Sequence, residues 1–278
     1  MLIKALVMAR LVSRRATGVQ PMPFRHVLIT GASAGLGAAF ARVLARPGAV
    51  LHLGARRAEA LAAVAEDCRA RGASVTTRLV DVRDAAAMAD WVRGAGRLDL
   101  VLANAGVSAG TGTAQEQDAR VRLIFETNLT GVLNTALPAL EVMAAQAPGE
   151  DGWRGHVAVV SSIAGFVAAP TAPAYCASKA AARAWAEARD ATERRRGLRV
   201  HALCPGFIRT AMTADNPFPM PWMMSPEVAA RRALAGIVAG RTRIAYPRRL
   251  YALTRLTGAL PPGLLNRLMM LAPGKPAG

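Results

Sequence analysis

The sequence predicts a three-layer α/β fold, in which a doubly wound parallel sheet of about seven strands lies between helices on both faces. Two observations predict this fold. From Arg25 onward, short apolar runs typical of buried strands alternate with segments whose apolar residues recur at helical spacing. The chain has 278 residues, of which 53% are hydrophobic and 19% are charged, so it can bury a large core. We find no internal repeat and expect a single domain over residues 23–247.

The expected elements follow one another in a regular order. Strands are expected at residues 26–30, 50–54, 75–80, 98–103, 156–161, 198–203 and 243–246. Helices are expected at residues 35–46, 58–71, 85–93, 115–145, 174–195 and 226–239. The second helix depends on Leu61, Val64 and Cys68, which recur at helical spacing. Pro138 is expected to kink or break the long fourth helix, and the polar stretch over 146–155 is expected to form a loop.

The composition excludes several classes of protein. No apolar run reaches the roughly 18 residues that a membrane-spanning helix needs, which excludes an integral membrane protein. The three cysteines, Cys68, Cys176 and Cys204, lie far apart and form no CxxC pair. This spacing excludes a disulfide scaffold and a thiolate zinc site, and it indicates a reducing compartment, the cytoplasm. No metal is expected.

The positive charge is concentrated at the two ends of the chain. The net charge is +17, from 35 basic and 18 acidic residues. Residues 1–58 and residues 228–278 each contain nine Lys or Arg and no Asp or Glu. This charge is either a solvated basic surface or an attraction to an anionic partner. Nucleic acid is not the expected partner, because residues 228–278 offer only Tyr246 and Tyr251 as aromatic stacking groups.

Residues 1–22 are expected to be a poorly ordered N-terminal extension. Lys4 and Arg10 interrupt its apolar stretch and no small-residue cleavage site follows, so a secretory signal is not indicated. An arginine-rich transit peptide and translation from Met22 are the alternative interpretations.

A glycine cluster follows the first expected strand and opens the first helix. Residues 30–37 read TGASAGLG. Glycines permit a tight turn and a close approach of the backbone, and the helix N-terminus presents N–H groups and a positive dipole to a phosphate. The spacing differs from the commoner Gly-x-Gly-x-x-Gly, but its place at a strand–helix junction indicates a dinucleotide site. The residues expected to bind the cofactor here are Gly31, Ser33, Gly35, Leu36 and Gly37.

Two arginines, Arg56 and Arg57, follow the second expected strand. A site for NAD(H) usually has an acidic residue near this position, which binds the ribose hydroxyls of adenosine. The first acidic residue in the chain is Glu59, and guanidinium groups suit a 2′-phosphate. The sequence therefore predicts NADP(H) in preference to NAD(H), with two solvated arginines as the alternative interpretation.

The segment Tyr175-Cys176-Ala177-Ser178-Lys179 carries the strongest chemical signal. Tyr175 and Lys179 are four residues apart and therefore share one face of a helix. A nearby ammonium favours the phenolate, so we expect Lys179 to lower the pKa of Tyr175 toward neutrality. Tyr175 would then be a general acid at physiological pH.

Ser162 lies thirteen positions before Tyr175, at the end of an expected strand. Its hydroxyl can hydrogen-bond a substrate carbonyl opposite the tyrosine, although the sequence pattern does not separate it from its neighbour Ser161. Asn128 lies within the long expected helix, where its amide is either functional or bonded to the local backbone.

Taken together, the motifs resemble the short-chain dehydrogenase/reductase family, in its single-domain branch with a Rossmann-type fold. The resemblance covers about residues 25–246 and depends on several motifs that occur in the family's order. These are TGASAGLG at 30–37, Asp81, NAG at 104–106, Asn128, Ser162, YCASK at 175–179 and PGFIRT at 205–210.

The resemblance implies a catalytic tetrad of Asn128, Ser162, Tyr175 and Lys179. It also implies further cofactor contacts, from Asp81, Val82, Asn104, Ala105, Gly106, Pro205, Gly206, Ile208 and Thr210, and from Tyr175 and Lys179 themselves. Asn128 would bend its helix and hold a water of a proton relay.

The resemblance implies hydride transfer between a nicotinamide cofactor and a carbonyl carbon, by a homodimer or homotetramer, but family membership does not name a substrate. With Arg56, Arg57 and the apolar segment 211–225, the expected activity is an NADP(H)-dependent interconversion of a carbonyl and an alcohol on a small, apolar substrate. A catalytically silent NADP(H)-binding regulatory or interaction protein is the alternative, although it would be expected to have lost Tyr175 or Lys179.

Residues 211–225 are rich in Met, Pro and aromatic residues, and in the family this segment covers the substrate. Its thioethers and rings suit an apolar substrate, whereas simple packing of a proline-rich loop is the alternative.

Residues 248–278 are expected to be a basic amphipathic extension, with two helices separated near Pro261 and Pro262. Leu250, Leu253, Thr257 and Leu260 are expected to share one face, with Arg248 and Arg255 roughly opposite. We expect this face to pack on the body or on a partner subunit. Peripheral contact with an anionic membrane is the alternative.

Overall fold

The structure is a computed structural model of the chain, and it describes residues 22–108, 116–214, 216 and 218–270. The expected N-terminal extension, apart from Met22, lies outside the described residues. Residues 271–278 of the expected C-terminal extension also lie outside them.

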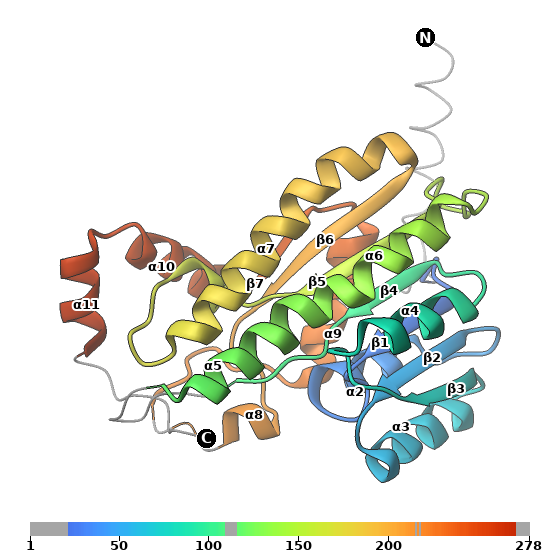
Figure 1. Cartoon of the computed structure of the whole chain (residues 1–278), viewed down its shortest axis with the longest axis horizontal. Helices are drawn as coiled ribbons and strands as arrows, with labels where there is room; N and C mark the ends of the chain where they lie inside the picture. The colour runs from blue at the N-terminus through green and yellow to red at the C-terminus, as the bar shows by residue number, and fades with distance from the viewer. Residues whose placement is uncertain (1–21, 109–115, 215, 217, 271–278) are drawn as a thin grey trace, which may run out of the picture.

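The core of the fold is a parallel sheet of seven strands, in the order β3-β2-β1-β4-β5-β6-β7. This architecture confirms the predicted doubly wound fold (Figure 1). The strands are β1 (His26–Thr30), β2 (Val50–Ala55), β3 (Ser74–Leu79), β4 (Leu100–Ala103), β5 (Gly155–Val160), β6 (Leu198–Pro205) and β7 (Arg243–Tyr246).

Helices cover both faces of the sheet. One layer contains α2 (Gly35–Leu44), α3 (Ala58–Ala70) and α9 (Pro226–Val238); the other contains α4 (Ala85–Gly94), α5 (Asp118–Phe125), α6 (Gly131–Ala144) and α7 (Pro173–Glu193) (Figure 1). Successive side chains of a strand point to opposite faces, so one strand contributes to both cores. In β1, Val27 and Ile29 pack in the core beneath α2 and α9, and Leu28 packs in the core beneath α4 and α6.

The long helix expected over residues 115–145 is interrupted, but not at Pro138. One turn of π-helix, Glu126–Thr130, joins α5 to α6, and Pro138 lies buried inside α6. The interruption surrounds Asn128, whose side chain bonds to the backbone of Val107 instead of facing solvent. Single-turn π-bulges inside α-helices are frequent at functional sites.

Five further elements complete the described chain. They are α8 (Ala211–Ala214), α10 (Arg248–Gly258), α11 (Pro262–Met270) and the short 3₁₀ turns Ile163–Phe166 and Arg194–Arg196. The two C-terminal helices lie at one end of the molecule (Figure 1). Among the described residues, no helix is long and apolar enough to cross a bilayer.

The buried face of α10 differs from the expected one. Leu250 and Thr254 are buried, whereas Leu253 is 50% exposed. Positions 250 and 254 are four residues apart and point to the same side, so α10 packs on the body through this narrower stripe.

Candidate active site

The candidate site lies where the strand order reverses. The chain leaves β1 toward β2 and leaves β4 toward β5, so the connections diverge and open a crevice between the carboxyl ends of β1 and β4. Thr30 and Asn104 join the two strand ends. The Thr30 hydroxyl accepts hydrogen bonds from the backbone N–H groups of Asn104 (3.0 Å) and Ala105 (3.1 Å), and the Asn104 side chain donates to the Thr30 carbonyl (2.9 Å).

The glycine loop forms a cradle of backbone at this crevice. Gly31 and Gly35 adopt left-handed φ angles of 65° and 55°, which favour glycine. A Cβ atom on Gly37 would overlap the carbonyl oxygen of Gly31, so this position also requires glycine. The N-cap of α2, Ala34, provides no side-chain cap, and the first turn of α2 contains no acidic residue. The N–H groups of this helix end are therefore suited to an anion.

The two predicted arginines border this cradle. The Arg57 guanidinium lies 3.4 Å from the Ser33 hydroxyl, and that of Arg56 lies 3.6 Å from the Asp81 carboxylate. Asp81 also forms a bidentate ion pair with Arg83, with a shortest distance of 2.7 Å. Arg83 and, to a lesser extent, Arg56 lower the pKa of the Asp81 carboxyl. Arg83, which the sequence analysis did not select, thus fixes the Asp81 carboxylate, one of the expected cofactor contacts.

Asn128 is fully buried and bridges two parts of the site. Its Oδ1 atom accepts from the Val107 N–H, and its Nδ2 atom donates to the Val107 carbonyl, both at 2.9 Å. The same amide donates to the Ser178 hydroxyl at 3.1 Å. A Cβ atom on Gly106 would lie 3.2 Å from Asn128 Oδ1 and 3.3 Å from Lys179 Nζ. Asn128 and Lys179 therefore both lie beside Gly106 of the NAG segment.

The structure separates the two neighbouring serines. The Ser161 hydroxyl is buried and donates to the Lys179 carbonyl at 2.7 Å, so it joins β5 to α7. The Ser162 hydroxyl accepts from the Ala164 N–H at 3.1 Å and caps the 3₁₀ turn that follows β5. Ser162 also lies near enough to the phenol of Tyr175 to lower its pKa.

Tyr175 and Lys179 share the inner face of α7, but the expected lowering of the tyrosine pKa is not found. Burial raises the pKa of Tyr175 to about 12, and the nearby Ser162 hydroxyl only partly opposes this rise. Lys179 Nζ donates to the Val160 carbonyl at 2.8 Å and lies 5.9 Å from the centre of the tyrosine ring. Burial lowers the pKa of Lys179 to about 8. Desolvation therefore dominates both groups in the protein alone.

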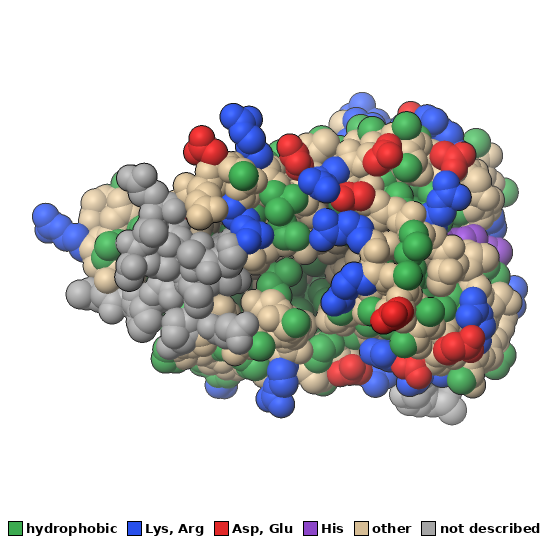
Figure 2. Space-filling model, turned by 60° about the horizontal axis from the view of Figure 1, so that its bottom comes forward, with side chains coloured by type: hydrophobic (Ala, Val, Ile, Leu, Met, Phe, Trp, Pro, Cys, Tyr) green, Lys and Arg blue, Asp and Glu red, His purple; other side chains and the backbone are tan. Residues whose placement is uncertain are grey.

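The remaining predicted residues lie around the same crevice. Val82 packs against Gly131 at the start of α6, and Thr210 lies over Gly35 of the glycine loop. Ile208 is buried and forms a parallel β-bridge with Met224, near the end of the segment 211–225. Pro205 ends β6 and its carbonyl lies 3.5 Å from the Ser162 hydroxyl, while Gly206 donates to the Tyr246 carbonyl at 2.7 Å. Figure 2 shows the face of the molecule at this end of the sheet, which is hollowed near its centre and bordered by basic side chains.

Behind the site, a cluster around Phe166 connects the 3₁₀ turn to three other elements. The guanidinium carbons of Arg183 on α7, Arg243 on β7 and Arg255 on α10 lie 4.3, 5.2 and 5.8 Å from the Phe166 ring centre. Tyr251 packs edge-on against the same ring at 5.1 Å. Cation–π contacts of this kind stabilise a structure by about 0.5–1 kcal/mol each at exposed positions.

Sequence reasoning missed Glu116 and Ser178. The carboxylate of Glu116 accepts from the Ala174 N–H at 3.2 Å, at the start of the helix that carries Tyr175. Ser178 holds the amide of Asn128. Both contacts join residues at least fifty positions apart, so no local pattern indicates them.

Comparisons of this chain with known protein families, sequences and structures agree with this geometry. A family model described as short chain dehydrogenase matches residues 25–218. The chain belongs to the short-chain dehydrogenase family.

Its relatives span most of the chain. An uncharacterized oxidoreductase of Myxococcus xanthus is 37% identical over 88% of this chain and 96% of its own length. An A-factor type gamma-butyrolactone 1'-reductase of Streptomyces virginiae is 36% identical over 69% of this chain and 74% of its own length. A solved short-chain dehydrogenase from Sphingobium yanoikuyae, in complex with NADPH, is 25% identical and aligns with a TM-score of 0.72 over 85% of this chain and 96% of that chain.

The residues present fit the nicotinamide dinucleotide that this family implies. The left-handed glycines, the close approach at Gly37 and the uncapped α2 N-terminus form a cradle for a pyrophosphate. Among the described residues, no group of three or more His, Cys, Asp or Glu side chains is placed to hold a metal ion.

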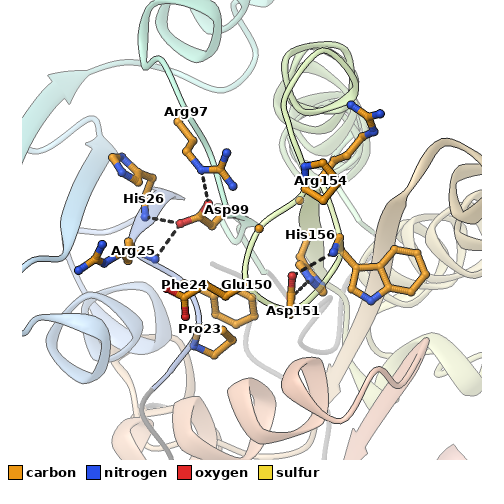
Figure 3. A pocket seen from close by; sticks show the side chains of 14 residues that line it. Pro23, Phe24, Arg25, His26, Arg97, Asp99, Glu150, Asp151, Arg154 and His156 are labelled. Carbon is orange, nitrogen blue, oxygen red and sulfur yellow. Dashed lines mark hydrogen bonds and ion pairs between the residues drawn. The ribbon is translucent and has the colours of Figure 1, made fainter. Parts of the chain in front are cut away.

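A second cavity, of about 310 Å³, lies at the opposite ends of β1 and β5 (Figure 3). Several of its charged groups are paired within the protein. Asp99 accepts from the backbone N–H groups of Arg25 and His26 and pairs with Arg97 at 2.9 Å, and His156 contacts Asp151 at 2.7 Å. These contacts join the loops at the amino ends of the strands, and we assign the cavity a structural role.

Proposed function

We propose that this oxidoreductase uses NADP(H) to interconvert a carbonyl and an alcohol on an apolar substrate, with Tyr175 as general acid and base. The observation that supports this proposal is the convergence of Asn128, Ser162, Tyr175 and Lys179 beside the glycine cradle. When bound, the cofactor supplies or accepts the hydride.

Tyr175 provides the proton. Because burial raises its pKa to about 12, the phenol keeps its proton at neutral pH and can donate it to the developing alkoxide of a reduced carbonyl. Ser162, which lies beside Tyr175, holds the carbonyl oxygen against the phenol and aligns it for proton transfer.

Lys179 and Asn128 organise the site. The ammonium of Lys179 is held by the Val160 carbonyl and has remaining donors for the ribose hydroxyls of the cofactor. Asn128 fixes the segment around Val107 and, through Ser178, the position of α7. We propose that it also holds the water of a proton relay.

The preference for NADP(H) is supported by Arg56 and Arg57. Arg57 reaches Ser33 of the glycine loop, and Arg56 lies beside Asp81, so two guanidinium groups border the place expected for the adenosine ribose. A 2′-phosphate would make bidentate, charge-assisted hydrogen bonds there. Among the solved relatives, the protein from Sphingobium yanoikuyae is a complex with NADPH and one from Mycobacterium paratuberculosis is bound to NAD, so the proposed preference depends on the two arginines of this chain.

An apolar substrate is supported by the segment after Thr210. Met212 and Trp222 are 44% and 46% exposed, and Phe218 packs against Phe207 at 6.1 Å. These side chains provide apolar surface beside the site for a substrate to contact. We further propose a homodimer or homotetramer in the cytoplasm; the three buried free thiols are consistent with a reducing compartment.

The proposal is tested by a screen of aldehydes, ketones and alcohols with NADPH and NADH, followed by the absorbance of the nicotinamide. The matched control is Tyr175→Phe, which keeps the ring and removes the proton donor. We expect this variant to lose turnover by a factor of roughly 10² to 10⁴ while it still binds NADPH. Turnover near that of the wild type in Tyr175→Phe would contradict the mechanism.

A further inference from the structure

The exposed apolar side chains of this protein are concentrated on α10 and α11. Of the eleven large apolar side chains that are exposed among the described residues, five belong to these two helices. They are Leu253 (50%), Leu256 (70%), Leu264 (54%), Leu268 (47%) and Met270 (68%). A cluster of exposed leucines within twenty residues of helix is typical of an interaction surface.

The same two helices carry only positive charge. Arg248, Arg249, Arg255 and Arg267 are exposed, and α10 and α11 contain no Asp or Glu. An apolar surface mixed with arginines and free of carboxylates matches a partner that is apolar inside and anionic outside.

The helices are anchored to the body by a separate set of contacts. Leu250 packs against Gly206, Gly258 packs against the backbone of Phe166, and Leu265 of α11 is buried. The exposed leucines are therefore free for an external partner while the helices stay folded on the enzyme, at one end of the molecule (Figure 1).

The apolar surface continues into a groove beside α7. This groove, of about 930 Å³, lies between α7, the segment 165–173 and the two C-terminal helices. Arg255 of α10 and Met270 of α11 line this groove, and so does Arg183 of α7. The exposed surface of α10 and α11 therefore continues into a groove that is lined by both apolar and basic side chains.

We propose that α10 and α11 dock the enzyme on the surface of an anionic lipid bilayer. The leucines enter the boundary between headgroups and acyl chains, and the arginines contact anionic headgroups. Two such signals together are what stable peripheral binding needs. A second copy of the chain fits less well, because a two-fold contact through this surface would bring arginines against arginines with no carboxylate in either helix.

The test is co-sedimentation of the full chain with vesicles of phosphatidylcholine alone or mixed with phosphatidylserine, at low and at high salt. Binding is measured without turnover, so the result is independent of the proposed reaction. We expect binding to the anionic vesicles that falls at high salt, and little binding to phosphatidylcholine.

Two double variants separate the contribution of the arginines to vesicle binding from that of the leucines. Arg248→Gln with Arg249→Gln should weaken binding to the anionic vesicles about thirtyfold, at roughly fivefold for each arginine. Leu256→Ser with Leu264→Ser should abolish binding at both salt concentrations. The matched controls are Arg71→Gln and Leu79→Ser, which change an exposed arginine and a 61% exposed leucine elsewhere and should bind like the wild type.

Equal binding of the wild type to both kinds of vesicle, or none to either, would overturn the proposal. Light scattering of the protein in solution provides the other decisive outcome. If the wild type is an oligomer that Leu256→Ser with Leu264→Ser converts to a smaller species, a second copy covers these helices and the membrane assignment is wrong.

Discussion

The side-chain amide of Asn128 pairs with the backbone of Val107 through two hydrogen bonds, as a neighbouring strand would. Both the N–H and the carbonyl of Val107 are satisfied by this one side chain. The amide thereby fixes the segment that follows β4, directly beside Gly106 and Lys179.

The variant Asn128→Leu should lose both stability and activity. It keeps the volume but leaves the Val107 N–H, the Val107 carbonyl and the Ser178 hydroxyl without these partners, which costs on the order of 2–4 kcal/mol. Urea unfolding measures the loss. Asn128→Asp is the control, because it retains an acceptor for the Val107 N–H and should fall between the wild type and Asn128→Leu; equal stability of all three proteins would refute the assigned role.

Replacement of Arg56 and Arg57 together by Ala should weaken NADPH binding tenfold or more, with a change of less than about threefold for NADH. The reason is the loss of charge-assisted hydrogen bonds to the 2′-phosphate, discounted for the exposure of these side chains. Titration of protein fluorescence with each cofactor measures the effect. Arg71→Ala, at the C-terminal end of the helix that Arg57 caps, is the matched control. Equal loss for the two cofactors would argue against NADP(H) preference.

Lys179→Met should abolish activity and yet stabilise the fold at neutral pH. Below pH 8 both the folded and the unfolded chain carry the ammonium, and its burial lowers its pKa from 10.5 to about 8. Removing this charge should stabilise the protein by on the order of 1–2 kcal/mol at pH 7, after allowance for the lost bond to Val160.

The pH dependence of this difference provides its own check. Between pH 8 and 10.5 the unfolded state binds more protons at this residue than the folded state, so the stability of the wild type rises with pH relative to the variant. The advantage of Lys179→Met should therefore shrink from pH 7 toward pH 9.5. An advantage that stays constant over this range would mean that the charge is not its source.

Gly258→Ala should loosen α10 from the site. A Cβ atom at Gly258 would overlap the carbonyl oxygen of Phe166, whose turn is capped by Ser162. We expect a loss of about 1–3 kcal/mol in stability from this overpacking, together with a lower kcat. Gly263→Ala is the control, since no atom lies within 4 Å of its added Cβ and the change should be neutral or stabilising. The same kcat in both variants would show that α10 does not position Ser162 and the 3₁₀ turn Ile163–Phe166 that it caps.

Local patterns in the sequence were sufficient to predict the order of strands and helices. The apolar runs and the glycines at the end of β1 identify their elements without distant neighbours. The pattern also predicted two helices after residue 247, but it placed Leu253 on the buried face because helical spacing alone does not show how wide the contact is.

Contacts between distant residues were beyond the reach of the sequence pattern. The helical pattern pointed to Pro138, and only the family resemblance placed the bend at Asn128, where the structure has the interruption and the bonds to Val107. The pKa of Tyr175 was misjudged for a related reason. The spacing of Tyr175 and Lys179 indicates proximity, but the burial of both groups, and the bond that draws the ammonium to Val160, depend on the folded surroundings.

The attachment of α10 to the site affects how α10 unfolds locally. Terminal helices commonly fray, and their amides then exchange with solvent faster than those of the interior. Here Leu250 contacts Gly206, and Arg255 and Gly258 meet Phe166, so α10 cannot leave without uncovering the turn that follows β5. The amides of α10 and of the first turns of α7 should therefore exchange through one shared opening event, so that α10 and the helix that carries Tyr175 form a single unit of unfolding.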